Sequence, residues 1–229
     1  MKAMILAAGF GTRLRPITDR IPKALVEHRG KPLILNVIDY LEKFGVTEFV
    51  VNIHHHHQLI SQFFEDNYTD RKISLLHEEP ILGTGGAIIN ASEFLNNSEY
   101  FIVMNVDIET DYNLQEALEL HISEKPFASI VIQDRQTERK LSVDNAMKLT
   151  GRTKHGDENK FAFNGIHILS DKIFNSGYKR EFLDIIDIYI SETMKGETIK
   201  GINAGSAFFI DLGKPENLKS YRTDSTRLI

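Results

Sequence analysis

The chain has 229 residues, and its 27 lysines and arginines against 32 aspartates and glutamates give a net charge of −5 with the histidines neutral. Hydrophobic residues at 41% and charged residues at 26% are typical of a globular protein and exclude a disordered or fibrous one. The sequence contains no cysteine, which excludes disulfides, thiolate metal sites and cysteine nucleophiles. The mild acidity argues against a general nucleic-acid binder.

No apolar stretch approaches the ~18 residues that a membrane span needs, and the glycines and arginines that follow Met1–Ala8 do not fit a signal peptide. We therefore expect a cytoplasmic protein with no membrane or nucleic-acid partner. No internal repeat, low-complexity segment or linker is visible, so we expect residues 1–229 to form a single domain. The sequence leaves open whether the chain forms a homo-oligomer.

Strand and helix patterns alternate through the first half of the chain, which predicts an α/β fold with a mostly parallel, Rossmann-like sheet flanked by helices. The predicted strands are Ala3–Ala8, Glu48–Ile53, Lys72–Leu76 and Tyr100–Met104. The predicted helices are Leu33–Phe44, ended by Gly45, then Gln58–Phe64, Gly85–Leu95 and Leu114–Ser123.

After Pro126 the pattern changes to short strands joined by polar turns, which predicts a small antiparallel elaboration. The predicted strands here are Ala128–Ile132, Lys140–Val143, Met147–Thr150 and Phe161–Leu169. We expect a helix near Arg180–Met194, a last pair of strands ending at Phe208–Ile210, and a closing helix after Pro215.

A glycine-rich segment follows the first predicted strand, and the carboxyl end of a parallel strand is where α/β folds bind ligands. Gly9 and Gly11 allow the backbone to turn with positive φ and to bring N–H groups close to an anion. Arg13 adds a permanent planar charge, and Lys23 adds a second cation within reach of the loop. These features favour a nucleoside triphosphate as the ligand.

Three alternative roles for this segment fit its residues less well. A dinucleotide-binding fingerprint needs glycine or alanine where Leu14 stands, and a helix where Arg15 and Pro16 would break one. A phosphate loop of the ATPase kind needs a Gly-Lys-Ser/Thr sequence, which does not follow. A glycine-rich turn without a ligand would not require the cations that gather around it.

The same residues carry a resemblance to a known family. Ala7-Ala8-Gly9-x-Gly11-Thr12-Arg13-Leu14-x-Pro16-x-Thr18, Pro22-Lys23-Ala24-Leu25 and Lys31-Pro32-Leu33 resemble the signature of the sugar-1-phosphate nucleotidyltransferases. The resemblance extends over nearly the whole chain and implies the nucleotide-diphospho-sugar transferase fold. Within the family, the short length and Phe163-Asn164-Gly165-Ile166-His167 most resemble N-acetylmuramate-1-phosphate uridylyltransferases and heptose-1-phosphate guanylyltransferases.

The resemblance implies a set of nucleotide-binding residues in two loops. Leu82-Gly83-Thr84-Gly85-Gly86 is similar to the family loop that reads the nucleobase. A structural alternative for this loop is a helix N-cap formed by Thr84. The residues expected to bind the nucleotide are Leu6, Ala8, Gly9, Gly11, Thr12, Arg13, Lys23, Gly83, Thr84 and Gly85.

Two distant aspartates match the family's metal ligands. Asp107 follows the fourth predicted strand, although Val106 stands where the family usually has glycine. Asp211 lies in Asp211-Leu212-Gly213-Lys214-Pro215-Glu216, which resembles the family's Asp-x-Gly-x-Pro-Glu segment. Two carboxylates with triphosphate oxygens would give Mg²⁺ the oxygen shell it prefers. Mg²⁺ is therefore the expected cofactor.

The implied reaction is attack of a sugar 1-phosphate on the α-phosphorus of the nucleotide, with Arg13, Lys23 and Asp107 as catalytic residues. The sugar-phosphate site is less sharply defined, because Glu124-Lys125-Pro126 lies too early to be the family's Glu-Lys-Pro. The region that matches it offers Arg152 and Lys154, and the following strand offers Asn164 and Gly165.

Four adjacent histidines, His54 to His57, follow the second predicted strand. Such a run could bind a transition metal. Alternate residues of a short segment point in different directions, however, so we interpret the run as a solvated or partly buried loop.

The leading hypothesis is formation of a nucleotide sugar from UTP and N-acetylmuramate 1-phosphate. The alternatives are a GTP-dependent heptose- or mannose-1-phosphate guanylyltransferase, a phosphocholine cytidylyltransferase, suggested by Pro22-Lys23-Ala24-Leu25, and an inactive nucleotide-sensing module, for which Val106 is a hint.

Overall fold

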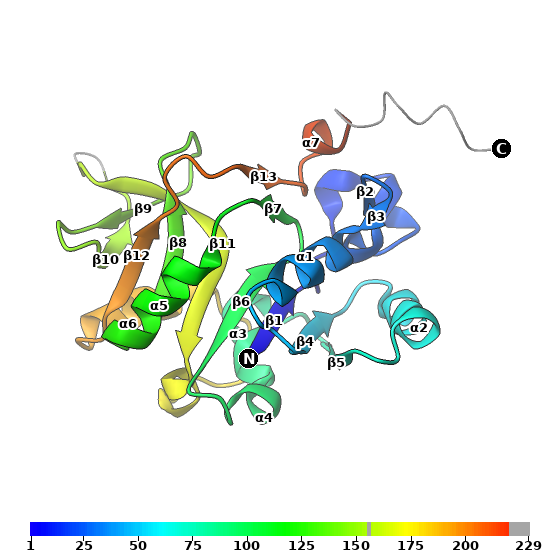
Figure 1. Ribbon diagram of the computed structural model, residues 1–229, viewed down its shortest axis with the longest axis horizontal. Coiled ribbons are helices and arrows are strands. Elements are labelled where there is room, and N and C mark those ends of the chain that lie inside the picture. The colour runs from blue at the N-terminus through cyan, green and yellow to red at the C-terminus, as the bar shows by residue number, and fades with distance from the viewer. Residues whose placement is uncertain (155–156, 220–229) are drawn as a thin grey trace.

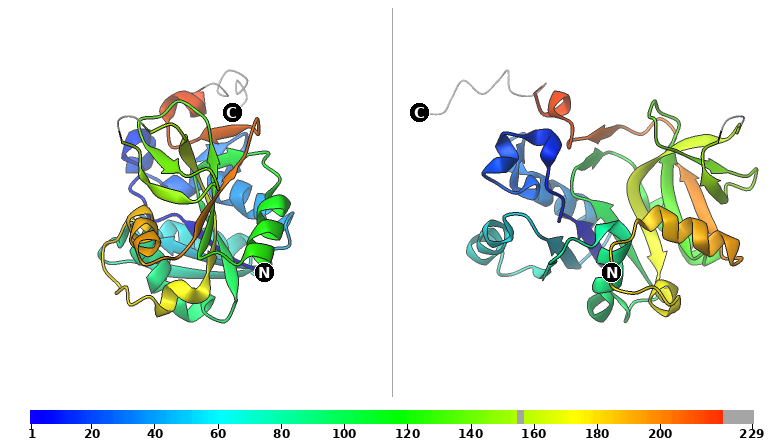
Figure 2. Two further views of the ribbon diagram at one scale, coloured as in Figure 1. Left: turned by 90° about the vertical axis from the view of Figure 1, so that its left-hand side faces the viewer. Right: turned by 180° about the vertical axis from the view of Figure 1, so that it is seen from behind.

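A computed structural model of the chain describes residues 1–154 and 157–219 (Figure 1). A nine-stranded mixed sheet with helices on both faces forms its centre, as the alternating patterns predict (Figure 2). The strands of this sheet are β1 (Lys2–Leu6), β4 (Glu48–Ile53), β5 (Lys72–His77), β6 (Tyr100–Asn105), β8 (Ala128–Gln133), β9 (Lys140–Val143), β10 (Leu149–Arg152), β11 (Lys160–Ser170) and β12 (Ile199–Asn203).

The parallel part of the sheet consists of β6, β1, β4 and β5, which lie side by side in that order. The predicted antiparallel elaboration continues this sheet, because β11 pairs antiparallel with β6, and β8 and β9 pair with β11. β10 extends the sheet beyond β9, and β12 pairs parallel with β8.

The principal helices are α1 (Leu33–Glu42), α2 (His57–Asn67), α3 (Gly83–Asn90), α4 (Ser92–Leu95), α5 (Leu114–Glu124), α6 (Ile185–Met194) and α7 (Pro215–Lys219). Two predicted helices differ from those observed. The helix expected over Gly85–Leu95 is divided at Ala91, whose ψ of 6° interrupts the helical backbone. The helix expected near Arg180–Met194 begins only at Ile185. The Leu183 N–H donates a hydrogen bond to the Leu82 carbonyl oxygen, and Asp184 forms the N-cap.

Strand alternation divides the core into two hydrophobic clusters, one on each face of the sheet. In β1, Ala3 and Ile5 belong to the cluster that also contains the buried residues of α1 and α5, whereas Met4 belongs to the cluster that contains those of α3 and α6. Figure 2 shows these helices on opposite faces of the sheet. In residues 1–154 and 157–219, no helix is long and apolar enough to cross a membrane.

Several short elements gather near the carboxyl ends of the parallel strands. They are the 3₁₀ turns Thr12–Leu14, Ile17–Asp19 and Lys23–Leu25, the hairpin of β2 (Glu27–His28) and β3 (Lys31–Pro32), and the antiparallel pair of β7 (Ile108–Thr110) and β13 (Phe209–Asp211). The β7–β13 pair was not predicted, and it returns the C-terminal segment to the end of β6 (Figure 1).

Two buried histidines are expected to make the fold sensitive to acid. Burial lowers the pKa of His167 to about 3 and that of His121 to about 4, from 6.5. As the pH falls, the unfolded chain therefore binds protons on these two histidines before the folded chain does. The contribution of the neutral histidines to the free energy of unfolding is complete above pH ~6.5 and is lost as the pH falls towards 4. We expect each histidine to reduce the free energy of unfolding by about 1.4 kcal/mol per pH unit in that interval.

Urea unfolding at about pH 7 and pH 5 would measure this dependence. His167→Gln should remove about half of the histidine contribution, while the carboxylate contribution cancels in the comparison with the wild type. An unchanged pH dependence in the variant would contradict a neutral native His167.

Candidate active site

The two aspartates expected to act together are brought to one place by the β7–β13 pair. Asp211 is opposite Ile108 in the register of this pair, and the Leu212 N–H donates to the carbonyl oxygen of Asp107 at 2.8 Å. Asp107 is buried, and the Asp211 side chain is one-quarter exposed. The pairing therefore joins two carboxylates that lie about a hundred residues apart in the sequence.

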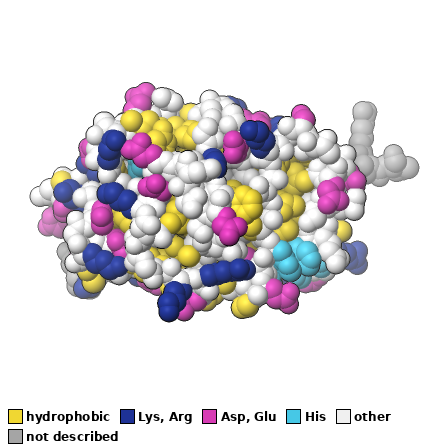
Figure 3. Space-filling view, turned by 90° about the horizontal axis from the view of Figure 1, so that it is seen from below, with side chains coloured by type: hydrophobic (Ala, Val, Ile, Leu, Met, Phe, Trp, Pro, Cys, Tyr) yellow, Lys and Arg dark blue, Asp and Glu magenta, His cyan; other side chains and the backbone are white. Residues whose placement is uncertain are grey.

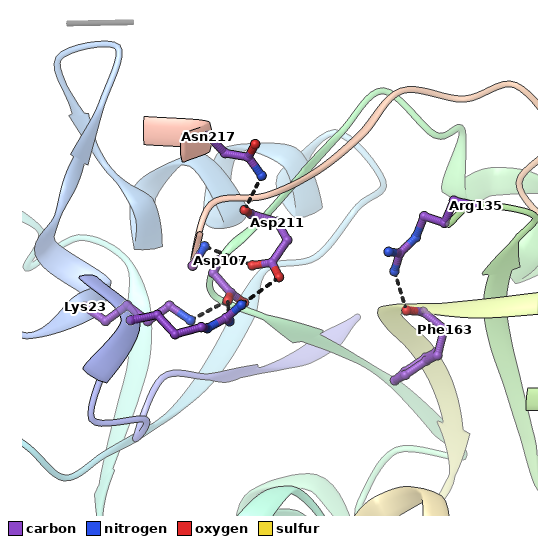
Figure 4. Close-up of polar contacts among 8 residues, drawn as sticks. Lys23, Asp107, Arg135, Phe163, Asp211 and Asn217 are labelled. Atoms are coloured by element: carbon purple, nitrogen blue, oxygen red, sulfur yellow. Dashed lines mark hydrogen bonds and ion pairs between the residues drawn. The ribbon is translucent and has the colours of Figure 1, made fainter. Parts of the chain in front are cut away.

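Two cations neutralise this pair (Figure 4). Lys23 Nζ donates to Asp107 Oδ2, and the Arg13 guanidinium lies 3.7 Å from the same oxygen and 3.2 Å from Asp211 Oδ2. Burial raises the pKa of the Asp211 carboxyl, but the Arg13 guanidinium, through its charge and its hydrogen bond, and the Gly213 N–H hold the pKa below its usual value. Asp211 is therefore an ionised oxygen donor near neutral pH.

Gly213 leaves the space in which the two carboxylates meet. A Cβ atom at this position would lie 2.5 Å from Asp107 Oδ2, 2.7 Å from Arg13 NH2 and 2.9 Å from Asp211 Oδ1. Two carboxyl groups that meet in this way match the oxygen donors that Mg²⁺ prefers. No group of three or more His, Cys, Asp or Glu side chains suited to a metal occurs within residues 1–154 and 157–219, so a divalent ion here would need further oxygen ligands from a substrate or water.

A cavity of about 250 Å³ lies between the glycine-rich loop and the start of α3. Its lining includes the predicted residues Leu6, Ala8, Gly9, Lys23, Gly83, Thr84 and Asp107, together with Asn52, Ile81, Asn105 and Val106. The dimensions suit part of a nucleotide, and Gly9 leaves open space above its own Cα. We call this space the loop cavity.

Four of the residues predicted to bind the nucleotide do not line the loop cavity: Gly11, Thr12, Arg13 and Gly85. Arg13 lines a second, adjacent cavity that is described below. Gly11 adopts a φ of 64° and packs against Thr18, whose hydroxyl donates to the Gly11 carbonyl oxygen at 2.8 Å. Thr12 is exposed at the start of a 3₁₀ turn. Gly85 is buried, and its N–H donates to Leu183. Gly11 and Gly85 are therefore accounted for by packing within the chain.

The glycines of the second loop also serve the packing of the segment before α6. A Cβ at Gly86 would lie 1.9 Å from the Glu181 carbonyl oxygen, and one at Gly83 would lie 2.6 Å from that of Leu183. The Thr84 hydroxyl accepts the Ile185 N–H at 2.9 Å. The alternative in which Thr84 forms the N-cap of its own helix is therefore wrong, because Thr84 lies inside α3 and its hydroxyl accepts an N–H from the first turn of α6 instead.

A buried network that the sequence analysis missed holds the two loops together. Asn52 Oδ1 accepts the Ala7 N–H at 2.8 Å, and Asn52 Nδ2 donates to Glu78 Oε1 at 2.9 Å. Glu78 Oε2 in turn accepts the Leu82 N–H at 3.0 Å, and its side chain is fully buried. The available signal was a polar residue, Asn52, at the end of an otherwise apolar strand.

Replacing Glu78 with alanine is expected to lower the free energy of unfolding by about 2–4 kcal/mol, because the Asn52 amide and the Leu82 N–H would lose their buried acceptors. Urea denaturation measures this loss. Glu93→Ala, at an exposed position on α4, is the matched control and should change stability by less than about 0.5 kcal/mol. Equal effects of the two substitutions would contradict the importance of the network.

A second cavity of about 460 Å³ shares Asn105 and Asp107 with the loop cavity. Of the residues predicted to bind the sugar phosphate, Arg152, Asn164 and Gly165 line it, as does Arg13. Lys154 does not, because it lies beyond the end of β10 with its side chain exposed. We call this space the outer cavity. Asp107 thus stands where the two cavities meet.

The outer cavity also contains Arg135, which the sequence analysis did not single out. Arg135 follows β8 by two residues, and Arg135 Nε donates to Asn164 Oδ1 at 3.0 Å. A cation just after a buried strand at this edge of the sheet was the signal that could have identified it.

Val106 does not distort the backbone before Asp107. Its N–H donates to the Leu6 carbonyl oxygen at 3.2 Å, and its side chain is buried in the core. The departure from the family pattern is therefore accommodated by packing against the end of β1.

The histidine run is partly buried and follows β4, and its last member, His57, is the first residue of α2. Figure 3, which views the molecule from below, shows a large patch of histidines. His54 Nδ1 contacts the Glu78 carbonyl oxygen at 2.7 Å, and His55 Nε2 contacts that of Thr18 at 3.2 Å. The ring of Phe10, from the glycine-rich loop, packs against both imidazoles. These histidines therefore form part of the support of that loop.

Known proteins resemble the chain in sequence and in fold. The sequence profile of the nucleotidyl transferase family matches residues 2–143. D-glycero-alpha-D-manno-heptose 1-phosphate guanylyltransferase of Campylobacter jejuni is 30% identical over 222 residues, which cover 95% of this chain and 96% of that protein. The crystal structure of HddC from Yersinia pseudotuberculosis has a TM-score of 0.78 and 26% identity, with 96% of each chain covered. The chain therefore belongs to the nucleotidyl transferase family.

Two further relatives are longer than this chain. Mannose-1-phosphate guanylyltransferase 1 of Arabidopsis thaliana is 33% identical over 235 residues, which cover 95% of this chain and 62% of that protein. The catalytic subunit beta of a Dictyostelium discoideum mannose-1-phosphate guanylyltransferase is 40% identical over 145 residues, 62% of this chain and 40% of that protein. The chain thus spans less than two thirds of the length of these two relatives.

Proposed function

We propose that the protein joins a nucleoside triphosphate to a sugar 1-phosphate, forming a nucleotide sugar and releasing pyrophosphate. The observation that carries this proposal is the position of Asp107 between the loop cavity and the outer cavity, beside Lys23, Arg13 and Asp211. Two substrates placed in these cavities would meet at the cluster of charged side chains.

The reaction needs no protein base. An anionic oxygen of the sugar 1-phosphate forms a bond to the α-phosphorus, and the bond from that phosphorus to the oxygen bridging to the β-phosphate breaks. Pyrophosphate leaves with the electron pair. Lys23 and Arg13 are positioned to stabilise the charge that develops on the phosphate oxygens. Asp107 and Asp211 would hold Mg²⁺, which when bound supplies positive charge against the triphosphate.

We further propose guanosine triphosphate and a mannose or heptose 1-phosphate as the substrates. The names of the Campylobacter and Arabidopsis relatives support this choice over UTP and N-acetylmuramate 1-phosphate, the pair expected first from the sequence. A second HddC structure, 25% identical to this chain, is described as complexed with GMP-PN and supports a guanine nucleotide in the same way.

Pyrophosphate release tests the proposal. ATP, CTP, GTP and UTP are each combined with the 1-phosphates of mannose, heptose, glucose and N-acetylmuramate in the presence of Mg²⁺. GTP with mannose or heptose 1-phosphate is expected to give the fastest release. Preference for UTP and N-acetylmuramate 1-phosphate would reject the substrate assignment, and no release from any pair would reject the enzymatic function.

A further inference from the structure

We propose that Arg135 is the side chain that binds the phosphate group of the sugar 1-phosphate, and that Arg152, the arginine suggested by the sequence, is not. This inference rests on the proposed function and assigns a residue to its second substrate. Both arginines line the outer cavity, so their different surroundings decide between them.

Arg135 is held rigidly by neutral partners. Its Nε donates to Asn164 Oδ1 at 3.0 Å. Its NH2 donates to the Phe163 carbonyl oxygen at 2.9 Å (Figure 4). Its guanidinium carbon lies 4.1 Å from the centre of the Phe209 ring. Within the described ranges 1–154 and 157–219, Arg135 forms no ion pair with a carboxylate. The half-buried guanidinium of Arg135 therefore has a fixed orientation in the outer cavity, and no carboxylate of the described residues neutralises its charge through an ion pair.

The position of Phe209 places this cation near the proposed reaction centre. Phe209 and Asp211 are two residues apart in β13, so their side chains project to the same face of that strand. The separation along the strand is about 7 Å. An anion bound to Arg135 would thus lie beside the Asp107 and Asp211 cluster, where the attacking phosphate oxygen is required.

Arg152 is already neutralised. Its NH2 lies 2.8 Å from Asp187 Oδ1 and 3.4 Å from Asp184 Oδ2, both at the start of α6. The Asp187 bond and the two negative charges outweigh burial and raise the pKa of Arg152. A phosphate group approaching Arg152 would meet two carboxylates, which disfavours binding of a dianion at this end of the cavity.

Arg135→Gln is expected to weaken α-D-mannose 1-phosphate binding by about 10- to 100-fold, the usual effect of losing a hydrogen bond from a charged group. Isothermal titration calorimetry measures this with the sugar phosphate titrated into protein saturated with Mg²⁺ and a GTP analogue in which a non-cleavable group replaces the oxygen between the α- and β-phosphorus atoms. Affinity for the analogue itself should change by less than about threefold, because Arg135 does not line the loop cavity. Arg152→Gln is the matched variant and should weaken binding of the sugar phosphate less than Arg135→Gln does.

Arg135→Lys tests whether the residue only braces β11. Lysine keeps the positive charge without the planar fork, so sugar-phosphate affinity should be intermediate between the wild type and Arg135→Gln. Circular dichroism tests whether each variant is folded. If Arg135→Gln is unfolded, the inference requires that Arg135→Lys by itself weakens sugar-phosphate binding more than nucleotide binding. Equal losses for both ligands, or a larger loss in Arg152→Gln, would overturn the inference.

The outcomes also separate this inference from the proposed function. Sugar-phosphate binding that depends on Arg135 without pyrophosphate release would support the inference and reject the enzyme. Pyrophosphate release with an unchanged sugar-phosphate KM in Arg135→Gln would reject the inference and leave the enzyme. The inference would also fall if the wild-type protein bound no sugar phosphate in the calorimeter.

Discussion

Asp107→Asn and Asp211→Asn are each expected to reduce pyrophosphate release by about 100- to 1,000-fold, the effect of losing one preorganised electrostatic contact at a phosphoryl-transfer centre. Asparagine has nearly the same shape as aspartate but carries no charge. In Asp107→Asn, Lys23 and Arg13 would lose the negative charge that they now share. We expect the loss to appear in kcat, because the negative charge of the aspartate contributes more in the transition state, where the reacting phosphate groups are aligned, than in the ground state.

Asp134→Asn is a suitable control for this pair. Asp134 carries the same carboxylate close to the outer cavity, but its side chain is 80% exposed, and within residues 1–154 and 157–219 it pairs only with Lys140, at 3.3 Å. The turnover of the Asp134→Asn variant should remain within about twofold of the wild type, because an exposed ion pair contributes little free energy. Full activity in Asp107→Asn or Asp211→Asn, with a circular dichroism spectrum like that of the wild type, would remove the substituted residue from the metal assignment.

Gly213→Ala is expected to reduce turnover by about 100-fold, the typical effect of displacing catalytic groups by about 1 Å. Gly213 does not have a positive φ angle, so the backbone itself tolerates alanine. The added methyl group would lie 2.5 Å from Asp107 Oδ2 and 2.9 Å from Asp211 Oδ1, inside normal contact distance. The substitution therefore separates the two carboxylates without removing either charge.

Gly177→Ala is the control for a glycine substitution that leaves the site untouched. Its φ of 83° makes alanine strained, but a Cβ there would meet nothing within 4 Å. The control should lower the free energy of unfolding by about 1 kcal/mol and leave kcat unchanged, whereas Gly213→Ala should lower kcat. Comparable kcat values for the two variants would show that catalysis does not require the close approach of Asp107 and Asp211 that Gly213 permits.

The sequence alone predicted the order of the principal elements and which polar residues follow the ends of the strands. Asp107 was recognisable because a buried run, Tyr100–Met104, delivers it to the edge of the sheet, and this pattern is local. Gly9 and Lys23 were recognisable for the same reason, since a short motif records both their residue types and their spacing. The boundaries of α3 and α6 were not predictable, because contacts between Leu82 and Leu183 determine where those helices begin.

Residue types and their periodicity along the chain were sufficient to predict a parallel sheet and a loop suited to phosphate, and the family resemblance implied that Asp107 and Asp211 act together. Only the tertiary structure decided which polar groups remain available to a ligand. Thr84 and Gly85 are hydrogen-bonded to α6 and Leu183, Arg152 is paired with two aspartates, and Arg135 forms no direct ion pair with the carboxylates of the described residues. The physical reason is that backbone conformation is strongly influenced by neighbouring residues, whereas the pairing of a charge depends on side chains that the chain brings together from distant positions.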